Sequence, residues 1–338
     1  MKAFRHLLVL MALLLAAPAL QAQEPPGLYK QPGPNSPTSK EQVQIYNPAQ
    51  DQIMGRVSIP DYKLSLLVQP EGREWREFRM VMLPIIAGAI ILGIVAALLL
   101  FYLVRGPVRI VGGRSGRLVP RFGTLDRFAH WTTAVSFLVM ALTGLIVTFG
   151  RWLLIPLIGH SAFTPLAEFS KVAHNFFSVP FVAGLLLMLV LWVRDNIPER
   201  ADLVWLKTMG GLFSKHGEHP ETGRFNAGQK GIFWSVIFGG AALAVTGFML
   251  MFPFYVTGIG GMQIFHVIHA VVAALLIGVI IAHIYIGSVG MEGAFDAMGS
   301  GEVDENWAKD HHRGWYNQLR RRTGPADTAA GVGHRAAE

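Results

Sequence analysis

The chain has 338 residues, of which 52% are hydrophobic and only 15% are charged. This composition is too apolar for an ordinary soluble domain of this length, so it predicts an integral membrane protein. The absence of cysteine excludes disulfides, cysteine-ligated iron–sulfur clusters and covalent attachment of a c-type heme. The net charge of +7 does not indicate a nucleic-acid partner, because the basic residues follow the loops between apolar segments.

Residues 1–22 have the pattern of a secretory signal peptide. Lys2 and Arg5 precede a short apolar core, and small residues lead to an expected cleavage after Ala22. The core is too short to cross a bilayer, although an uncleaved anchor is the alternative. Residues 23–79 are polar and hold seven basic and seven acidic residues, so we expect an exported, partly irregular segment.

Five apolar segments then follow, each long enough to span a membrane. The first is an uncharged run at residues 80–104. The other four are predicted at about residues 128–150, 172–193, 231–252 and 264–288. Pro253 and the glycines near it mark the hairpin between the last two spans. The predicted fold is an all-α integral membrane protein: a transmembrane four-helix bundle plus one additional N-terminal transmembrane helix.

The distribution of basic residues predicts the orientation in a bacterial inner membrane. Lysine and arginine number six in residues 105–127, six in 194–230 and six after 289, but only two in 151–173 and none in 253–264. Basic loops stay on the cytoplasmic side. The N-terminus is therefore predicted in the periplasm and the C-terminus in the cytoplasm, with residues 321–338 as a disordered cytoplasmic tail.

Four histidines lie within or at the ends of the predicted spans: His130, His174, His269 and His283. Ionisable groups in a membrane are costly and usually mark a function, although a single histidine bonded to a neighbouring carbonyl is an equal alternative. His269 and His283 are 14 residues apart, which separates them by roughly 21 Å and returns them to within about 40° of one helix face. His266 is roughly 100° away from His283 and suits this stripe less well.

Topology supplies a partner for each histidine of the last span. His130 lies at the cytoplasmic start of its span, at the same depth as His283. His174 lies at the periplasmic start of its span, at the same depth as His269. Two pairs of histidines, one in each leaflet, predict two six-coordinate hemes. A zinc site at His266 and His269 is the rival interpretation, although no cysteine or acidic ligand accompanies them. The remaining histidines are expected at solvated surfaces: His160, His216, His219, His311 and His312.

Several strings in this part of the chain resemble the cytochrome b subunit, or gamma subunit, of membrane-bound formate dehydrogenases. They are LDRFAHW, KVAHNFF, RDNIPE, RFNAGQKGIFW, VIHAVVAALLIGVIIAHIYIG and WAKDHHRGWY, and they occur in order over residues 121–320. The first 120 residues exceed the shorter members of that family. Residues 121–320 are therefore expected to form a di-heme cytochrome b domain.

The resemblance implies two b hemes with the axial pairs His174–His269 and His130–His283. It also implies a partner iron–sulfur (beta) subunit, which relays electrons from a molybdenum- or tungsten-containing alpha subunit that oxidises formate. The chain itself would pass electrons to a membrane quinone and would not act on formate.

The quinone pocket of the family involves the positions of Asn226, Gly228 and Gln229 beside the His283 heme. From the residues alone, the same string is better explained as a polar turn that caps the next helix.

Two other functions fit part of this pattern. The cytochrome b of a hydrogenase, or of another quinone-linked oxidoreductase, would share the heme scaffold. A membrane anchor or transporter without heme is a different class, which a reduced-minus-oxidised visible spectrum would distinguish.

Overall fold

The structure is a computed structural model that describes residues 46–47, 52–53, 70–208, 210 and 221–330. The predicted signal peptide, most of the exported segment, His216, His219 and residues 331–338 lie outside the described residues. The chain divides into two units, Met1–Glu77 and Phe78–Glu338. In the first unit, β1 (Tyr46–Asn47) pairs antiparallel with β2 (Gln52–Ile53), and α2 covers Pro70–Glu77.

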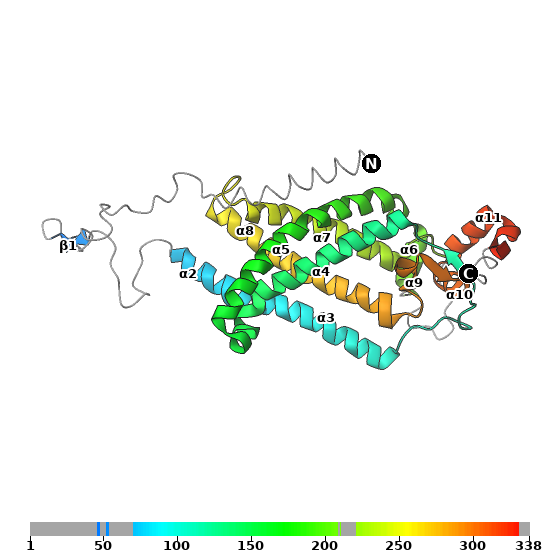
Figure 1. The fold of residues 1–338 in the computed structure, drawn as a ribbon, viewed down its shortest axis with the longest axis horizontal. Coiled ribbons are helices and arrows are strands. Elements are labelled where there is room, and N and C mark those ends of the chain that lie inside the picture. Colours follow the sequence, from blue (N-terminus) through cyan, green and yellow to red (C-terminus); the bar gives the residue numbers. More distant parts are fainter. Residues whose placement is uncertain (1–45, 48–51, 54–69, 209, 211–220, 331–338) are drawn as a thin grey trace. The chain divides into compact units, whose positions relative to one another are not determined.

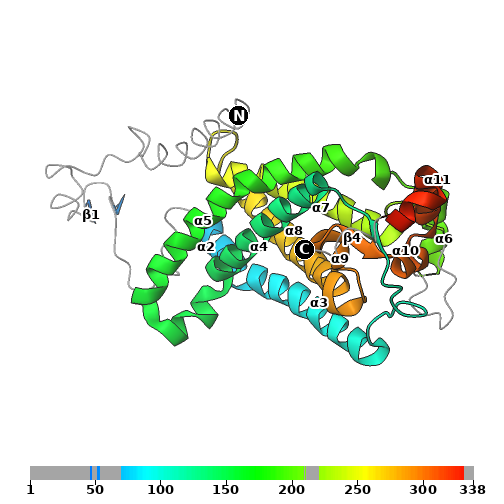
Figure 2. The same ribbon diagram turned by 45° about the vertical axis from the view of Figure 1, so that its right-hand side comes forward.

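Among the described residues, five helices are long and apolar enough to cross a membrane, which confirms the predicted all-α class and the five predicted spans. Those of the second unit are α3 (Leu83–Arg105), α4 (Thr124–Leu153), α5 (Ile155–Trp192), α7 (Ala227–Met251) and α8 (Ile259–Tyr285). Helix α4 packs against α5, α7 against α8, and α5 against α7. The additional helix α3 lies along α8 at the edge of this bundle (Figures 1 and 2).

One helix extends far beyond its predicted span. Helix α5 begins at Ile155 and not near residue 172, so the expected loop at 155–171 is helical and includes His160. The backbone bends at Gly159, where φ is 75°, and continues as helix. The hydropathy of the sequence predicted only the apolar part of this helix, residues 172–193. A helix can extend beyond the hydrocarbon region, because polar side chains are solvated there.

Short π-helical turns, η2 (Phe78–Met82) and η5 (Ile286–Gly290), adjoin α3 and α8, the first and last spans in the sequence. Such turns insert an extra residue into the helical repeat and rotate the side chains that follow. Together with α3 and α8 they lengthen the two spans that lie side by side.

One end of the bundle carries a compact cap, which we call the capped end. Here β3 (Leu118–Pro120) pairs antiparallel with β4 (Glu302–Asp304), with Val119 opposite Val303. Helices α6 (Arg200–Lys207), α9 (Asp296–Gly299), α10 (Glu305–His311) and α11 (Arg313–Ala330) complete it, with the 3-10 turn η3 (Arg194–Asn196). The segment before α4 is thereby tied to the segment after α8.

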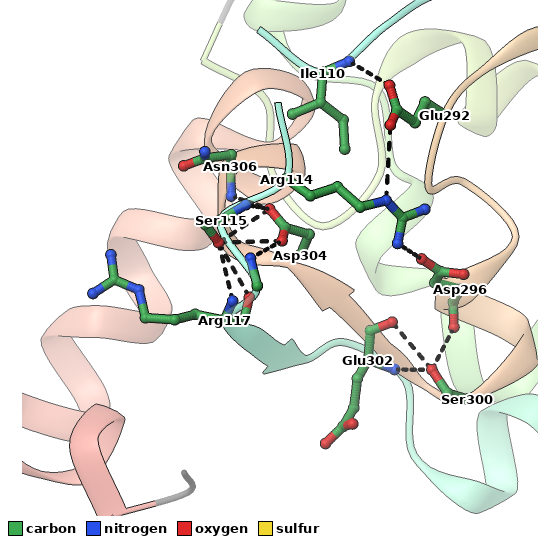
Figure 3. Close-up of polar contacts among 11 residues, drawn as sticks. Ile110, Arg114, Ser115, Arg117, Glu292, Asp296, Ser300, Glu302, Asp304 and Asn306 are labelled. Atoms are coloured by element: carbon green, nitrogen blue, oxygen red, sulfur yellow. Dashed lines mark hydrogen bonds and ion pairs between the residues drawn. The ribbon is translucent and has the colours of Figure 1, made fainter. Parts of the chain in front are cut away.

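Asp304 is the acidic centre of this connection (Figure 3). Its carboxylate accepts hydrogen bonds from the backbone N–H groups of Ser115 (3.1 Å), Gly116 (2.9 Å) and Asn306 (2.8 Å). Burial alone would raise the pKa of Asp304, but these hydrogen bonds to the ionised form hold the pKa below its ordinary value. Nearby, the Arg114 guanidinium lies 3.1 Å from a carboxylate oxygen of Asp296.

The expectation of a solvated His311 and His312 is wrong, because both side chains are buried in the cap. His312 Nδ1 lies 3.1 Å from the Gly223 carbonyl, and its Nε2 lies 3.0 Å from Arg121 Nη2. Burial and the charge of Arg121 hold the pKa of His312 well below its ordinary value. The ring is thus neutral, donates from Nδ1 and accepts from the guanidinium at Nε2.

Arg121 is buried between aromatic rings. Its guanidinium carbon lies 4.7 Å from the ring centroid of Trp315 and 5.2 Å from that of Trp307. Burial and the charge of Arg224 lower the pKa of Arg121 to about 9. The WAKDHHRGWY string therefore folds back onto the start of the bundle, and its aromatic rings stabilise a buried cation.

Residues 321–330, which were expected in a disordered tail, continue helix α11 as far as Ala330. The arginines at positions 320–322 favour this continuation by local propensity, whereas Gly324 and Pro325 within it are poor helix formers.

A close contact between α4 and α5 predicts the effect of a single methyl group. A Cβ on Gly184 would lie 2.4 Å from Thr133 Oγ1 and 3.0 Å from the Thr133 backbone nitrogen. We expect Gly184→Ala to destabilise the protein by about 1–3 kcal/mol, because overpacking forces the two helices apart. Thermal unfolding in detergent measures this change. Gly93→Ala in α3 is the matched control, since a Cβ there meets nothing within 4 Å; equal melting temperatures for the two variants would contradict the expectation.

Candidate functional site

The four histidines singled out in the sequence come together as two pairs. The ring centroids of His130 on α4 and His283 on α8 are 6.1 Å apart. Those of His174 on α5 and His269 on α8 are 6.2 Å apart. Helix α8 therefore contributes one histidine to each pair, and the α4–α5 hairpin contributes the other.

Hydrogen bonds identify the nitrogen of His174 that carries its proton. His174 Nδ1 lies 3.0 Å from the Met140 carbonyl and 3.1 Å from Thr143 Oγ1. The Thr143 hydroxyl donates its one hydrogen back to its own helix, at the Val139 carbonyl (2.8 Å). The hydroxyl can then only accept from the ring, so Nδ1 bears the hydrogen and Nε2 keeps a lone pair for a metal.

The same arrangement recurs at His269. His269 Nδ1 lies 2.9 Å from Thr246 Oγ1 on α7, and that hydroxyl donates to the Ala242 carbonyl at 2.7 Å. Nδ1 of His269 therefore also carries the hydrogen. In this pair both Nε2 atoms are left as acceptors, which is the protonation state that metal-binding imidazoles require.

Thr143 and Thr246 were not recognised in the sequence as part of the site. Each is followed by a glycine that faces the same histidine: a Cβ on Gly144 would lie 3.6 Å from His174 Cε1, and one on Gly247 would lie 3.3 Å from His269 Cε1. The signal was present as a Thr-Gly pair in the first helix of each hairpin, α4 and α7. This repeat is short, and only the packing of each hairpin connects it to a histidine.

The spacing of the pairs fits a six-coordinate metal between two imidazoles. A metal–nitrogen bond of about 2.0–2.1 Å, plus about 1.1 Å from nitrogen to ring centre on each side, places the centroids about 6.3 Å apart. The observed 6.1 and 6.2 Å agree with that distance. A zinc ion would need further ligands, and in the described part of the chain no three His, Asp or Glu side chains are grouped to hold one.

The His130 pair lies toward the capped end. His130 Nδ1 is buried and has no hydrogen-bond partner among the described residues. His130 therefore lacks the threonine contact that His174 and His269 have. The helix start is held instead by α9, since Trp131 Nε1 donates to the Met298 carbonyl at 2.9 Å and Arg127 Nη2 donates to the Gly299 carbonyl at 2.5 Å. The two histidine pairs therefore differ in their surroundings.

Asn226 and Gln229 form a reciprocal cap at the start of α7. Asn226 Oδ1 accepts from the Gln229 backbone N–H at 3.0 Å, and Gln229 Oε1 accepts from the Asn226 N–H at 3.1 Å. The capping interpretation of the string is thus realised. Both bonds use the amide oxygens, so the two side-chain NH2 groups take no part in the cap. Gly228 has a packing reason, because a Cβ there would lie 2.7 Å from the Trp205 ring.

This loop is fixed next to the start of α4. Arg224, two residues before Asn226, forms ion pairs with Asp126 (3.1 Å) and Asp195 (2.8 Å). Asp126 precedes His130 by one helical turn and also accepts from Trp192 Nε1 at 2.6 Å. The Asn226–Gln229 loop and the His130 pair therefore lie at the same end of the bundle.

Lys230 secures the loop from the other side. Its ammonium group is buried and lies 2.9 Å from Asp202, 3.3 Å from Glu199 and 3.0 Å from the Ile197 carbonyl. These contacts use all three N–H donors of the lysine. The RDNIPE and RFNAGQK strings are thus two halves of one polar network around α6.

Comparison with known proteins places the bundle in a family. Residues 121–301 match the family described as prokaryotic cytochrome b561. The nitrate-inducible formate dehydrogenase cytochrome b556(Fdn) subunit of Escherichia coli K12 is 30% identical over 225 residues, which cover 64% of this chain and 99% of the relative. The formate dehydrogenase cytochrome b556(fdo) subunit of the same organism is 31% identical over 61% of this chain and 95% of its own length.

A third relative, the formate dehydrogenase cytochrome b556 subunit of Haemophilus influenzae, is 28% identical over 59% of this chain and 82% of its own length. The family match includes all four paired histidines and the Asn226–Gln229 loop. Helix α3 lies before it and is outside the matched residues.

The threonine bonds predict a measurable electronic effect on a heme held by the His174–His269 pair. A hydrogen bond from Nδ1 raises the basicity of the coordinating nitrogen and stabilises the oxidised iron. We expect Thr246→Val to raise the midpoint potential of that heme by up to about 40 mV, the equivalent of about 1 kcal/mol for one electron. A spectroscopic redox titration measures it.

Thr133→Val is the matched control, because the buried Thr133 hydroxyl donates to the Ala129 carbonyl of its own helix. An equal change of potential in both variants would show that the Thr246–His269 bond has no electronic role.

Proposed function

The chain belongs to the prokaryotic cytochrome b561 family, and from this membership we propose that it is the di-heme electron-transfer subunit of a formate dehydrogenase complex. The two Escherichia coli relatives described above are named as cytochrome b subunits of formate dehydrogenases. On this proposal, the chain receives electrons from an iron–sulfur partner subunit and delivers them to a membrane quinone. It binds no formate and anchors the partner subunits to the membrane.

The observation that carries the proposal is the pairing of four histidines across the bundle, with centroid distances of 6.1 and 6.2 Å. His174 and His269 would hold one heme, and His130 and His283 the other. A heme b held by two imidazoles has no open coordination position, so it supplies one-electron transfer and no substrate chemistry. Thr143 orients His174 and Thr246 orients His269, and the apolar side chains of the helices exclude water from the site.

Replacement of single ligands tests the two-heme assignment. We expect His130→Ala or His283→Ala to remove one heme, and His174→Ala or His269→Ala to remove the other, because each iron loses an axial ligand. The wild-type protein should contain about two hemes per chain, and each variant about one. His266→Ala is the control and should keep both. Wild-type protein that folds without heme would contradict the function, and heme loss in the control would contradict the ligand choice.

We propose that the capped end faces the cytoplasm. Residues 106–123, 193–208, 221–226 and 291–330, which hold most of the basic residues outside the spans, lie on this side, and basic loops are retained in the cytoplasm. Electrons would then enter at the His174–His269 pair, near the periplasm, and leave near His130 and His283.

Reporter fusions test this orientation. Alkaline phosphatase folds only after export, so a fusion in the α7–α8 turn near Gly258 should be active and a fusion after residue 330 inactive. The reverse pattern would overturn both the orientation and the direction of electron flow. A fluorescent protein that folds only in the cytoplasm provides the complementary control at both positions.

We further propose that quinone is reduced beside the Asn226–Gln229 loop. The Arg224–Asp126 ion pair holds this loop against the helix turn that precedes His130, at 3.1 Å. The amide NH2 groups of Asn226 and Gln229, which the helix cap does not use, can donate to a quinone oxygen. At the cytoplasmic surface, this position would let the reduced quinone take its protons from the cytoplasm.

Charge-changing replacements separate the quinone role from the capping role. Asn226→Asp and Gln229→Glu keep the oxygen that caps α7 and lose the NH2 donors. We expect both to retain two hemes and the wild-type melting temperature, but to slow heme reoxidation by quinone about tenfold, the equivalent of one lost hydrogen bond. Stopped-flow absorbance in the assembled complex measures this rate.

Asn226→Ala and Gln229→Ala provide the comparison, since they lose the cap as well and should cost about 1 kcal/mol of stability. If the acidic variants reoxidise at the wild-type rate, the loop is only a helix cap and the quinone binds elsewhere.

A further inference from the structure

Arg79 and His266 form a polar contact between the additional helix and the ligand-bearing helix. Arg79 lies in η2, the π-helical turn before α3, and its Nε donates to His266 Nε2 at 3.1 Å. His266 lies on α8, three residues before His269. The contact joins residues 187 positions apart in the sequence, so it is made by the packing of α3 on α8.

Helix α3 is held firmly enough against the bundle to position Arg79. Ile94 fills the space over Gly278 of α8, where a Cβ would lie 2.1 Å from its side chain. Farther along, the rings of Phe101 and Tyr102 meet Tyr285 edge to face, with centroids 6.4 and 6.3 Å apart. The start of α3 also meets α4, since a Cβ on Gly88 would lie 3.6 Å from the Phe149 ring.

The contact places a positive charge one helical turn from the His174–His269 pair. Residues three apart on a helix differ by about 60° in direction and about 4.5 Å in height, so His266 and His269 are neighbours on one side of α8. The guanidinium bonded to His266 is therefore displaced from the paired imidazoles toward the end of the bundle opposite the cap. Its bond to His266 uses one of its five N–H donors.

A heme b carries two propionate carboxylates, which need cationic partners where the membrane is poorly solvated. Residues 231–291, which contain all of α8 and the part of α7 after Lys230, hold no Lys, Arg, Asp or Glu. Apart from Lys230, which is paired with Asp202 and Glu199 at the capped end, the α7–α8 hairpin therefore offers only histidine as a cationic partner for such a carboxylate. Arginine is the side chain best suited to this ligand, because its planar guanidinium binds a carboxylate through two parallel hydrogen bonds.

We propose that Arg79, oriented by His266, binds a propionate of the heme held by His174 and His269. This inference rests on the proposed function. It assigns a role to the additional N-terminal helix, which lies outside the family match: α3 brings a cation to the edge of one heme only. A phospholipid phosphate is the other anion that this pair of side chains could bind at a membrane surface.

Arg79→Gln in the His130→Ala background isolates the heme in question, because that background is expected to keep only the His174–His269 heme. We expect a lower midpoint potential for this heme, since loss of a nearby cation disfavours addition of an electron. We also expect faster transfer of the heme to an apo-heme acceptor protein. Arg79→Lys should keep the potential close to that of the background, because the charge is retained, and should show an intermediate transfer rate.

Arg151→Gln is the matched control. Arg151 lies in the last turn of α4 at the same end of the bundle, two residues after Phe149, and its loss also removes one positive charge. The control should leave the heme potential and transfer rate unchanged. Equal shifts in Arg79→Gln and Arg151→Gln would reduce the effect to general surface charge and overturn the propionate site.

The remaining outcomes separate this inference from the function on which it rests. If the unaltered protein lacks heme, the proposed function fails. If it holds two hemes and Arg79→Gln changes neither potential nor transfer rate, only the propionate site fails. If Arg79→Gln instead loses binding to phosphatidylglycerol vesicles with no redox change, the pair binds lipid phosphate and the inference is overturned.

Discussion

A neutral imidazole keeps Nε2 available to a metal only when its hydrogen lies on Nδ1, and the His174–His269 pair meets this requirement within the bundle. At His174 and His269 a threonine of the neighbouring helix takes the Nδ1 hydrogen, at 3.1 and 2.9 Å. Each ring then keeps Nε2 as an acceptor. The glycine after each threonine leaves room for the ring, so the helix hairpins α4–α5 and α7–α8 fix the ligands before any cofactor binds.

The cap holds the helix ends that carry the second pair. Asp304 gathers the segment before α4, and Asp126 joins α4 to α5 and, through Arg224, to the start of α7. Buried Arg121 and neutral His312 fasten the C-terminal helices to the same place. The Asn226–Gln229 loop, where we propose that quinone binds, is therefore part of the network around the start of α4. Its amide oxygens cap α7, and its amide NH2 groups remain available to a ligand.

The additional helix changes one side of this scaffold. It covers α8, which contributes a histidine to both pairs, and brings Arg79 to the side of the His174–His269 pair. Its other side chains are largely exposed and apolar, including Leu99, Leu100 and Leu103, as expected for a surface that faces lipid. A helix added at this position can influence one heme without altering the shared bundle.

The sequence by itself determined the membrane class, the five spans and the four histidines, because apolar runs and ionisable groups within them are local signals. Helical periodicity also anticipated that His269 and His283 share a face. Only the tertiary structure decided which atoms support the ligands. Thr143 and Thr246 contact histidines on the other helix of their hairpin, and Arg79 contacts His266, 187 positions away in the sequence. His312 lies among polar residues in the sequence, but it is buried because the C-terminal segment folds back onto the start of the bundle. Such contacts depend on how helices pack, which no short pattern in one helix records.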